Sequence, residues 1–498
     1  MRKQHWILPL IFLIVVGFRL FFAFQSPYFN YEGYYGLRQV ENIAKTGIPL
    51  YNDELSYGGK ISAFPPFFYY FLALFNLFMP INLVGKILPN IFASLLIFAV
   101  YLIVKDFTKN ANVALLTSFF AGFIPIFVSG TVNNSSPYSL TFPLMFFAMY
   151  SLIKIDEKNH MYIFIILMII LTLTSAFAFL FVGGLMVYLL LLRTEGIKQI
   201  KSEPEIIMLT VFLVVWIEFL IFKNAFLANG IGIIGQNIPS EIISNYFGGT
   251  TILDTIYALG LLPFIFGIYM IYKITFKEKE RDFYLMVGFS IVTFLALWFK
   301  IIPLTSALMS LGIVLTILFG QFCGRVFDYI EKTRVSRYKF LFFIALFTVF
   351  IATSVLASAV YSNSSSVKVP SKEEIAALEW LKENSKESEV ILASLDEGSL
   401  IVHKTGRKNV IDSDFLFSKN PEQRLKDVKI LYTTYYETDA LSLSGKYGIN
   451  YIYFSKEALK NYKMENIAYV SNEQCFDPIY LNEKIKIYRI LCKLEEIR

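Results

Sequence analysis

Apolar segments of about 20 residues recur between Trp6 and Val360, separated by short polar stretches. The hydrocarbon core of a bilayer is about 30 Å thick, and a helix of about 20 apolar residues crosses it. The pattern therefore predicts a polytopic α-helical membrane protein with about eleven transmembrane helices. The expected helices lie near residues 6–24, 85–104, 112–129, 138–154, 160–175, 176–193, 206–223, 251–272, 283–299, 302–322 and 340–360.

Basic residues gather in alternate loops between these segments and predict the orientation of the chain, because cytoplasmic loops are enriched in Lys and Arg. The N-terminus is therefore expected in the cytoplasm, and eleven crossings then place the C-terminus outside. The apolar segment 64–80 is predicted not to cross, since a crossing there would move every later basic loop outside. The basic residues that predict the orientation are Arg2, Lys3, Lys105, Lys109, Arg193, Lys198, Lys201, Lys273, Lys277, Lys279, Arg281, Arg325, Lys332, Arg334, Arg337 and Lys339.

The composition changes after Val360 to that of an ordinary water-exposed protein. Ser371 and Glu374 form a capping box that predicts the start of an amphipathic helix. Short β-like runs alternate with further helical stretches, which predicts a small α/β domain. The expected strands are 390–392, 409–411 and 449–453, and the expected helices are 419–425 and 440–447.

The chain of 498 residues is therefore divided into a membrane domain, 1–360, and an extracytoplasmic α/β domain, 361–498. The membrane domain is expected to carry a long first outer loop, residues 25–84. A loop of that length exceeds what a simple connection needs, and such loops often carry function. Of the three cysteines, Cys475 and Cys492 lie in segments that could be neighbouring strands, and a disulfide is possible if the domain is outside.

The formal net charge of +6 excludes few classes of function by itself, since it arises mostly in the basic loops. Exposed aromatic residues do not interleave with a basic face, so nucleic-acid binding is not expected. The three histidines are scattered, and no glycine-rich phosphate loop is present. Any chemistry is therefore expected in the outer loops.

The first outer loop holds Glu32, Arg38, Asp53, Glu54 and Lys60. A carboxylate at the membrane surface can act as a general base or as a ligand for a divalent cation. Arginine and lysine side chains suit a phosphate or diphosphate group. The alternative is that these residues are solvated loop charges.

The segment Glu32-Gly33-Tyr34-Tyr35-Gly36-Leu37-Arg38 resembles the first-loop motif of the oligosaccharyltransferase catalytic subunits, which are GT-C glycosyltransferases. The resemblance implies a GT-C fold and transfer of a sugar from a polyprenyl-phosphate or diphosphate donor to an acceptor protein, lipid or glycan outside. It makes Glu32 the catalytic residue, with Tyr34, Arg38, Asp53, Glu54 and Lys60 as candidates for substrate binding. It also implies a divalent cation, Mg or Mn, held by Glu32 and Glu241.

Three further candidates follow from the same resemblance. Glu241 lies in a second outer loop similar to the one that contacts acceptor and metal. Lys300 would bind a lipid-linked phosphate, or its side chain simply reaches the interface. Asp396 precedes Glu397-Gly398, which keeps the Asp and Gly of the acceptor-binding motif without its tryptophans.

The sequence also departs from the family pattern. The first-loop acid is Glu32 rather than aspartate, and the next outer loop, residues 131–136, has no acid. Two other functions therefore stay open. One is a non-catalytic relative that binds lipid or a partner, and the other is a polytopic transporter or flippase.

Overall fold

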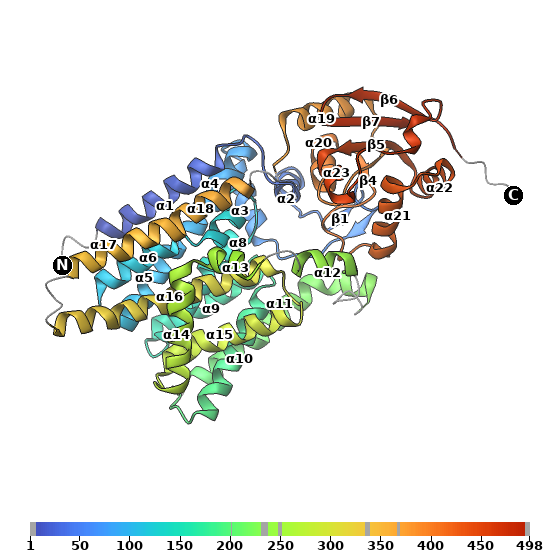
Figure 1. The fold of residues 1–498 in the computed structure, drawn as a ribbon. Coiled ribbons are helices and arrows are strands. Elements are labelled where there is room, and N and C mark those ends of the chain that lie inside the picture. The colour runs from blue at the N-terminus through green and yellow to red at the C-terminus, as the bar shows by residue number, and fades with distance from the viewer. Residues whose placement is uncertain are drawn as a thin grey trace. The chain divides into compact units, whose positions relative to one another are not determined.

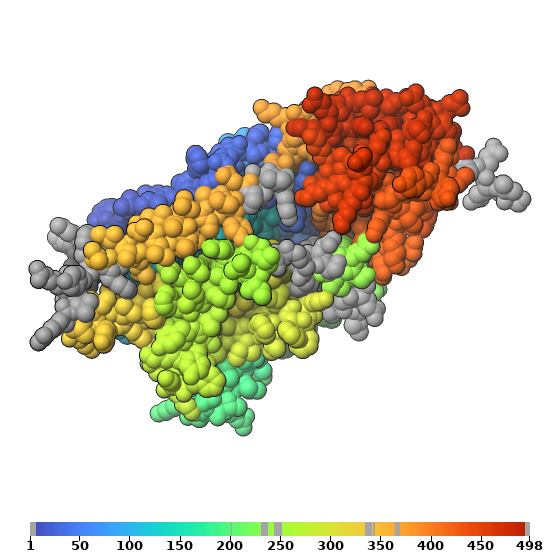
Figure 2. Space-filling model, viewed as in Figure 1, coloured from blue at the N-terminus to red at the C-terminus, as the bar shows by residue number. Residues whose placement is uncertain are grey.

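The computed structural model describes residues 6–200, 202–230, 238–247, 251–333, 339–365 and 369–493, so Arg2, Lys3, Lys201, Arg334 and Arg337 lie outside the described residues. The chain forms two compact units. The helical unit comprises Met1–Pro27, Phe64–Ile221 and Asn245–Val367. The α/β unit comprises Tyr28–Ala63, Phe222–Ser244 and Lys368–Arg498. Its C-terminal part, orange to red, is one compact body in Figures 1 and 2.

Each predicted transmembrane segment lies in one helix or in consecutive helices, which confirms a helical polytopic architecture. The first of these are α1 (Ile7–Ala23), α4 (Ile81–Ser94), α5 (Leu96–Thr108), α6 (Ala111–Ala121), α7 (Pro125–Thr131), α8 (Tyr138–Ile153), α9 (Lys158–Thr174) and α10 (Ala178–Thr194). The later ones are α11 (Glu203–Asn229), α13 (Ile252–Leu259), α14 (Leu261–Phe276), α15 (Arg281–Trp298), α16 (Leu304–Lys332), α17 (Lys339–Phe350), the π-helix η4 (Ile351–Val355) and α18 (Leu356–Ser365).

The structure does not test the predicted number of membrane crossings directly. Among the described residues, 5 helices are long and apolar enough to cross a bilayer, or up to 7 if each bent pair counts as one span. The count of eleven therefore stays a prediction. Segment 64–80 forms only α3 (Phe67–Asn76), a helix of 10 residues. Such a helix is about 15 Å long, which is half of the bilayer core.

Glycines allow helices of this unit to approach one another closely. A Cβ at Gly288 of α15 would lie 2.9 Å from the backbone nitrogen of Tyr188 on α10. A Cβ at Gly184 would lie 3.1 Å from the Cα of Phe289. Small residues at helix contacts are typical of membrane proteins, where packing rather than the hydrophobic effect holds helices together.

The α/β unit is built on a mixed sheet of 5 strands in the order β4-β3-β5-β7-β6. Strand β3 pairs in parallel with β4 and β5, whereas β7 runs antiparallel to β5 and β6. The strands are β3 (Val390–Leu392), β4 (Lys408–Asn409), β5 (Ile449–Ser455), β6 (Phe476–Leu481) and β7 (Ile485–Ile490). The helices of the tail are α19 (Lys372–Asn384), α20 (Gly398–Thr405), α21 (Pro421–Thr433), α22 (Glu437–Tyr447) and α23 (Lys456–Tyr462).

Local signals in the tail act as the sequence predicts. Ser371 and Glu374 form the predicted capping box at the start of α19. Cys475 and Cys492 flank the hairpin of β6 and β7, and they form a disulfide with their Cα atoms 4.8 Å apart. The predicted α/β character and the possible disulfide are both confirmed.

The first outer loop belongs to the α/β unit and adds three elements to it. These are α2 (Gly33–Thr46), β1 (Asn52–Asp53) and β2 (Lys60–Ile61), with β1 antiparallel to β2. The backbone nitrogen of Asn409 donates to the carbonyl of Leu55 at 2.9 Å. The Tyr57 hydroxyl donates to the carbonyl of Asp412 at 2.5 Å. The loop is thus part of the tail domain's framework.

Lys60 connects the hairpin to the tail through ion pairs. Its Nζ lies 3.1 Å from Asp412 Oδ1 and 3.1 Å from Asp414 Oδ2. The side chains of Lys60 and Asp412 have no exposed surface. Burial alone would lower the pKa of Lys60, but the two carboxylates outweigh it and raise that pKa. The Lys60 ammonium is therefore charged, and the carboxylates of Asp412 and Asp414 compensate its charge.

A second buried ionisable group, the carboxyl group of Glu397, lies just before α20. Glu397 is buried, and the Ser394 hydroxyl donates to its Oε2 at 2.5 Å, whereas its Oε1 has no hydrogen bond in the part of the chain that the structure describes. Burial raises the pKa of Glu397 to about 8, against hydrogen bonds from Ser394 and Ser455. The carboxyl group is therefore protonated at neutral pH in the folded protein.

Removing the Lys60 charge is expected to destabilise the α/β unit. Lys60→Met leaves two carboxylates without their cation, and breaking a buried pair costs about 3–5 kcal/mol. The matched control is Lys429→Met, because Lys429 pairs with Glu241 at the surface, where both side chains are about half exposed. That change is expected to cost less than about 1 kcal/mol. Thermal unfolding of the purified protein measures both, and equal losses would contradict the prediction.

Glu397 predicts a pH dependence of stability. An unfolded glutamate has a pKa of about 4.3. With a folded pKa of about 8, the folded state holds a proton that the unfolded state releases between these values. The stability contribution is thus full below pH 4.3 and falls as pH rises towards 8. Glu397→Gln should gain melting temperature relative to the wild type between pH 5 and 8. Parallel profiles of the two proteins would refute this.

Candidate functional site

Glu32 stands immediately before α2, the helix formed by the motif of the first loop. The helix buries Tyr34, Leu37 and Arg38 on its inner face, and Glu32 is exposed. It ends at Gly47, whose positive φ of 76° suits glycine. The loop therefore presents an exposed carboxylate at the N-terminal end of α2.

Arg38 and Asp53 hold that helix against the β1–β2 hairpin. The guanidinium nitrogens Nη1 and Nη2 each lie 2.9 Å from one carboxylate oxygen of Asp53. Burial raises the pKa of Asp53, but Arg38 outweighs this and holds it below its usual value. Asp53 also pairs across the hairpin with Lys60. The structure thus brings Arg38, Asp53 and Lys60 together, in contacts that position the loop.

Tyr34 is buried on the same face of α2. Its ring centroid lies 5.2 Å from that of His403 in α20, and Lys404 Nζ lies 5.8 Å from the same ring. Burial lowers the pKa of His403 to about 3, so its imidazole is neutral. Tyr34 therefore packs α2 onto the tail helix α20.

The other predicted residues have different surroundings. Glu54 is exposed after β1. Glu241 accepts a hydrogen bond from Lys429 Nζ at 2.8 Å, and Asp396 accepts one from Asn461 Nδ2 at 3.2 Å. Lys300 belongs to the helical unit, where it follows α15 in a left-handed conformation with φ of 57°.

The described residues do not fit the divalent cation that the resemblance implies. Across residues 6–493, apart from the gaps given above, no group of three or more His, Cys, Asp or Glu side chains could hold a metal ion. Glu241 instead forms an ion pair with Lys429.

Lys86 is a buried polar residue of the helical unit that the sequence analysis did not single out. Lys86 is buried in α4 and donates to Asn133 Oδ1 at 3.2 Å, as well as to the carbonyls of Ala23 and Ser26. Asn133 lies in the loop where the resemblance expects an acid. Lys86 stands within an apolar run, and a lysine there is a signal for a functional or structural contact.

Comparisons with known proteins place the fold. No protein-family model and no curated protein sequence matches the chain. The Archaeoglobus fulgidus oligosaccharyltransferase in its apo form matches with a TM-score of 0.71 and 13% identity, over 94% of this chain and 72% of that one. The same enzyme, AglB, in complex with an inhibitory peptide and a dolichol-phosphate gives a TM-score of 0.67 at 13% identity, over 92% and 70%. It has also been crystallised with Zn and sulfate.

A bacterial enzyme matches over an even larger share of both chains. ArnT from Cupriavidus metallidurans bound to undecaprenyl phosphate has a TM-score of 0.56 and 12% identity, and the match covers 97% of each chain. Identities this low concern the fold. The chain therefore has the fold of the GT-C membrane glycosyltransferases, as the first-loop motif indicated.

Proposed function

We propose that this membrane protein is a glycosyltransferase that moves a sugar or glycan from a polyprenyl-phosphate or diphosphate donor to an acceptor on the outer face of the membrane. The observation that carries the proposal is the fold match over 94% of the chain to an oligosaccharyltransferase. The two neighbouring enzymes bind a dolichol-phosphate and undecaprenyl phosphate, which supports a polyprenyl-linked donor here.

The proposed topology has eleven crossings, a cytoplasmic N-terminus and an extracytoplasmic α/β unit. The distribution of Lys and Arg between loops supports it. The disulfide between Cys475 and Cys492 supports it independently, because disulfides persist in oxidising compartments outside the cytoplasm. The α/β unit, which includes the first loop, would then be extracytoplasmic.

In the proposed mechanism Glu32 is the general base. Its exposed carboxylate accepts the proton from a hydroxyl or amide of the acceptor. The freed oxygen or nitrogen attacks the anomeric carbon of the donor. The bond between that carbon and the phosphate oxygen breaks, and the polyprenyl phosphate or diphosphate leaves with the electron pair. Arg38 acts through Asp53 as a positioning residue, since their paired contacts fix α2 and with it Glu32.

A non-catalytic relative is the second candidate. The finding that favours it is that the described residues do not offer a metal-binding group. Such a protein would keep the fold and bind lipid or a partner without transfer. The activity of the Glu32 variant separates the two.

Glu32→Gln is expected to lower the transfer rate by about 10²-fold or more, because a general base contributes about 10²–10⁴-fold. The assay follows radiolabelled sugar from polyprenyl-linked donors in membranes that contain the protein, with and without added Mg or Mn. Glu465→Gln is the matched control, since Glu465 is an exposed carboxylate of the same unit. Equal activity of Glu32→Gln and the wild type would remove Glu32 from the mechanism. No transfer by any form, over several donors, would favour the non-catalytic candidate.

The topology makes a separate prediction. A cysteine introduced at Glu465 should react with a membrane-impermeant maleimide added to intact cells, because the α/β unit is expected outside. A cysteine introduced at Lys198 should react only after the membrane is opened. The reverse pattern would overturn the proposed orientation.

A further inference from the structure

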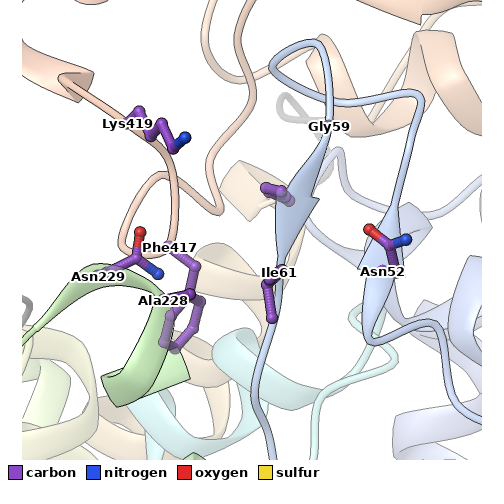
Figure 3. Close-up of a pocket in the computed structure, with 8 residues that line it drawn as sticks. Asn52, Gly59, Ile61, Ala228, Asn229, Phe417 and Lys419 are labelled. Carbon is purple, nitrogen blue, oxygen red and sulfur yellow. The ribbon is translucent and has the colours of Figure 1, made fainter. Parts of the chain in front are cut away.

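The α/β unit contains a cavity of about 280 Å³. Of the predicted site residues, only Lys60 lines it. Three segments line it: the β1–β2 hairpin, the C-terminal end of α11 and the loop before α21. Figure 3 shows Asn52 and Ile61 on the hairpin, Asn229 at the end of the helix, and Phe417 and Lys419 on the loop. Its volume is near the lower end of the range for small-molecule sites.

Two amide side chains supply the polar part of the wall. Asn52 is exposed, and in the described part of the chain no hydrogen bond engages its side chain. Asn229 donates one hydrogen bond from Nδ2 to the carbonyl of Ala225 at 3.3 Å, and among the described residues its Oδ1 accepts none. An amide both donates and accepts. It therefore matches a ligand hydroxyl, which also does both.

An aromatic ring supplies the apolar part. Phe417 packs against Phe222, with ring centroids 6.4 Å apart, so the ring is held in place by its own unit. Ile61 adds an apolar side chain that is 40% exposed. A wall with an apolar face and a few placed polar groups suits a flat ligand with one hydrophobic side and hydrophilic edges.

The local charge argues against an anion as the ligand. Lys419 is exposed and has no ion pair with any residue that the structure describes. Lys60 is compensated by Asp412 and Asp414 behind the wall. The two lysines and two carboxylates sum to zero, and phosphate recognition usually relies on several cationic donors. The Lys419 ammonium is then one more hydrogen-bond donor for a neutral ligand.

We propose that this cavity is a saccharide-binding subsite that takes one neutral sugar ring, separate from Glu32. The ring lies against Phe417 and its hydroxyl groups bond to Asn52, Asn229 and Lys419. The identification of its natural source rests on the proposed function: the sugar belongs either to the lipid-linked donor or to a glycan acceptor. Both sources offer the same hydroxyl-bearing ring.

Binding is measured on the purified full chain by saturation-transfer NMR with a panel of free neutral hexoses, N-acetylhexosamines and their disaccharides. Asn52→Ala and Lys419→Ala should each weaken binding roughly three- to tenfold, as expected for the loss of one hydrogen bond. Both residues are exposed, so both variants should fold. Tyr435→Ala is the control, because Tyr435 is 83% exposed and does not line the cavity.

Three results would overturn the subsite. They are binding of no saccharide to the wild type, unchanged affinity in both Asn52→Ala and Lys419→Ala, and displacement of the sugar by millimolar inorganic phosphate. Loss of affinity in those two variants, with Tyr435→Ala like the wild type, would support it.

Transfer kinetics then identify the source and separate the two proposals. Asn52→Ala should raise the KM of the donor if the bound sugar belongs to the donor, or the KM of the acceptor if it belongs to the acceptor, with kcat retained. Glu32→Gln should lower kcat and leave saccharide binding intact. If no form transfers sugar but binding still depends on Asn52 and Lys419, the proposed function fails and the subsite stands.

Discussion

The contact of Lys60 with Asp412 and Asp414 is the interaction on which the α/β unit depends. The Lys60 side chain has no exposed surface, and its charge is compensated by these carboxylates, since an isolated buried charge is very costly. The sequence supplies both carboxylates from a single turn of the tail. The hairpin that carries Lys60 is therefore tied to the segment around Asp412. Arg38 and Asp53 extend the same framework to α2, and so to the carboxylate of Glu32.

The elements that sequence reasoning predicted well are those defined by local patterns. The apolar segments form helices because a helix satisfies its own backbone in lipid. The capping box at Ser371 starts α19, and the cysteines flank neighbouring strands. The first-loop motif indicated the GT-C fold, which the solved structures share. The number of crossings is less accessible, because several apolar helices here are bent or short.

The candidate site was predicted only in part, because its contacts join residues far apart in the chain. No local pattern links Lys60 to Asp412, which are 352 positions apart. The charges of Arg38 and Lys60 fitted a phosphate site equally well, and only the structure shows that carboxylates of the same unit engage them. The cavity lined by Asn52, Asn229 and Phe417 uses uncharged residues from three segments, which carry no motif.

The distance in sequence between the hairpin and the tail has a consequence for biosynthesis. A ribosome adds about 5–20 residues per second, so the hairpin would wait tens of seconds for the segment around Asp412 to be made. During that interval Lys60 and Tyr57 lack Asp412, their partner in the tail. Assembly of this unit is therefore a late event, and a chain that stops before residue 409 would leave the loop open to proteases and chaperones, even with every helix of the helical unit already synthesised.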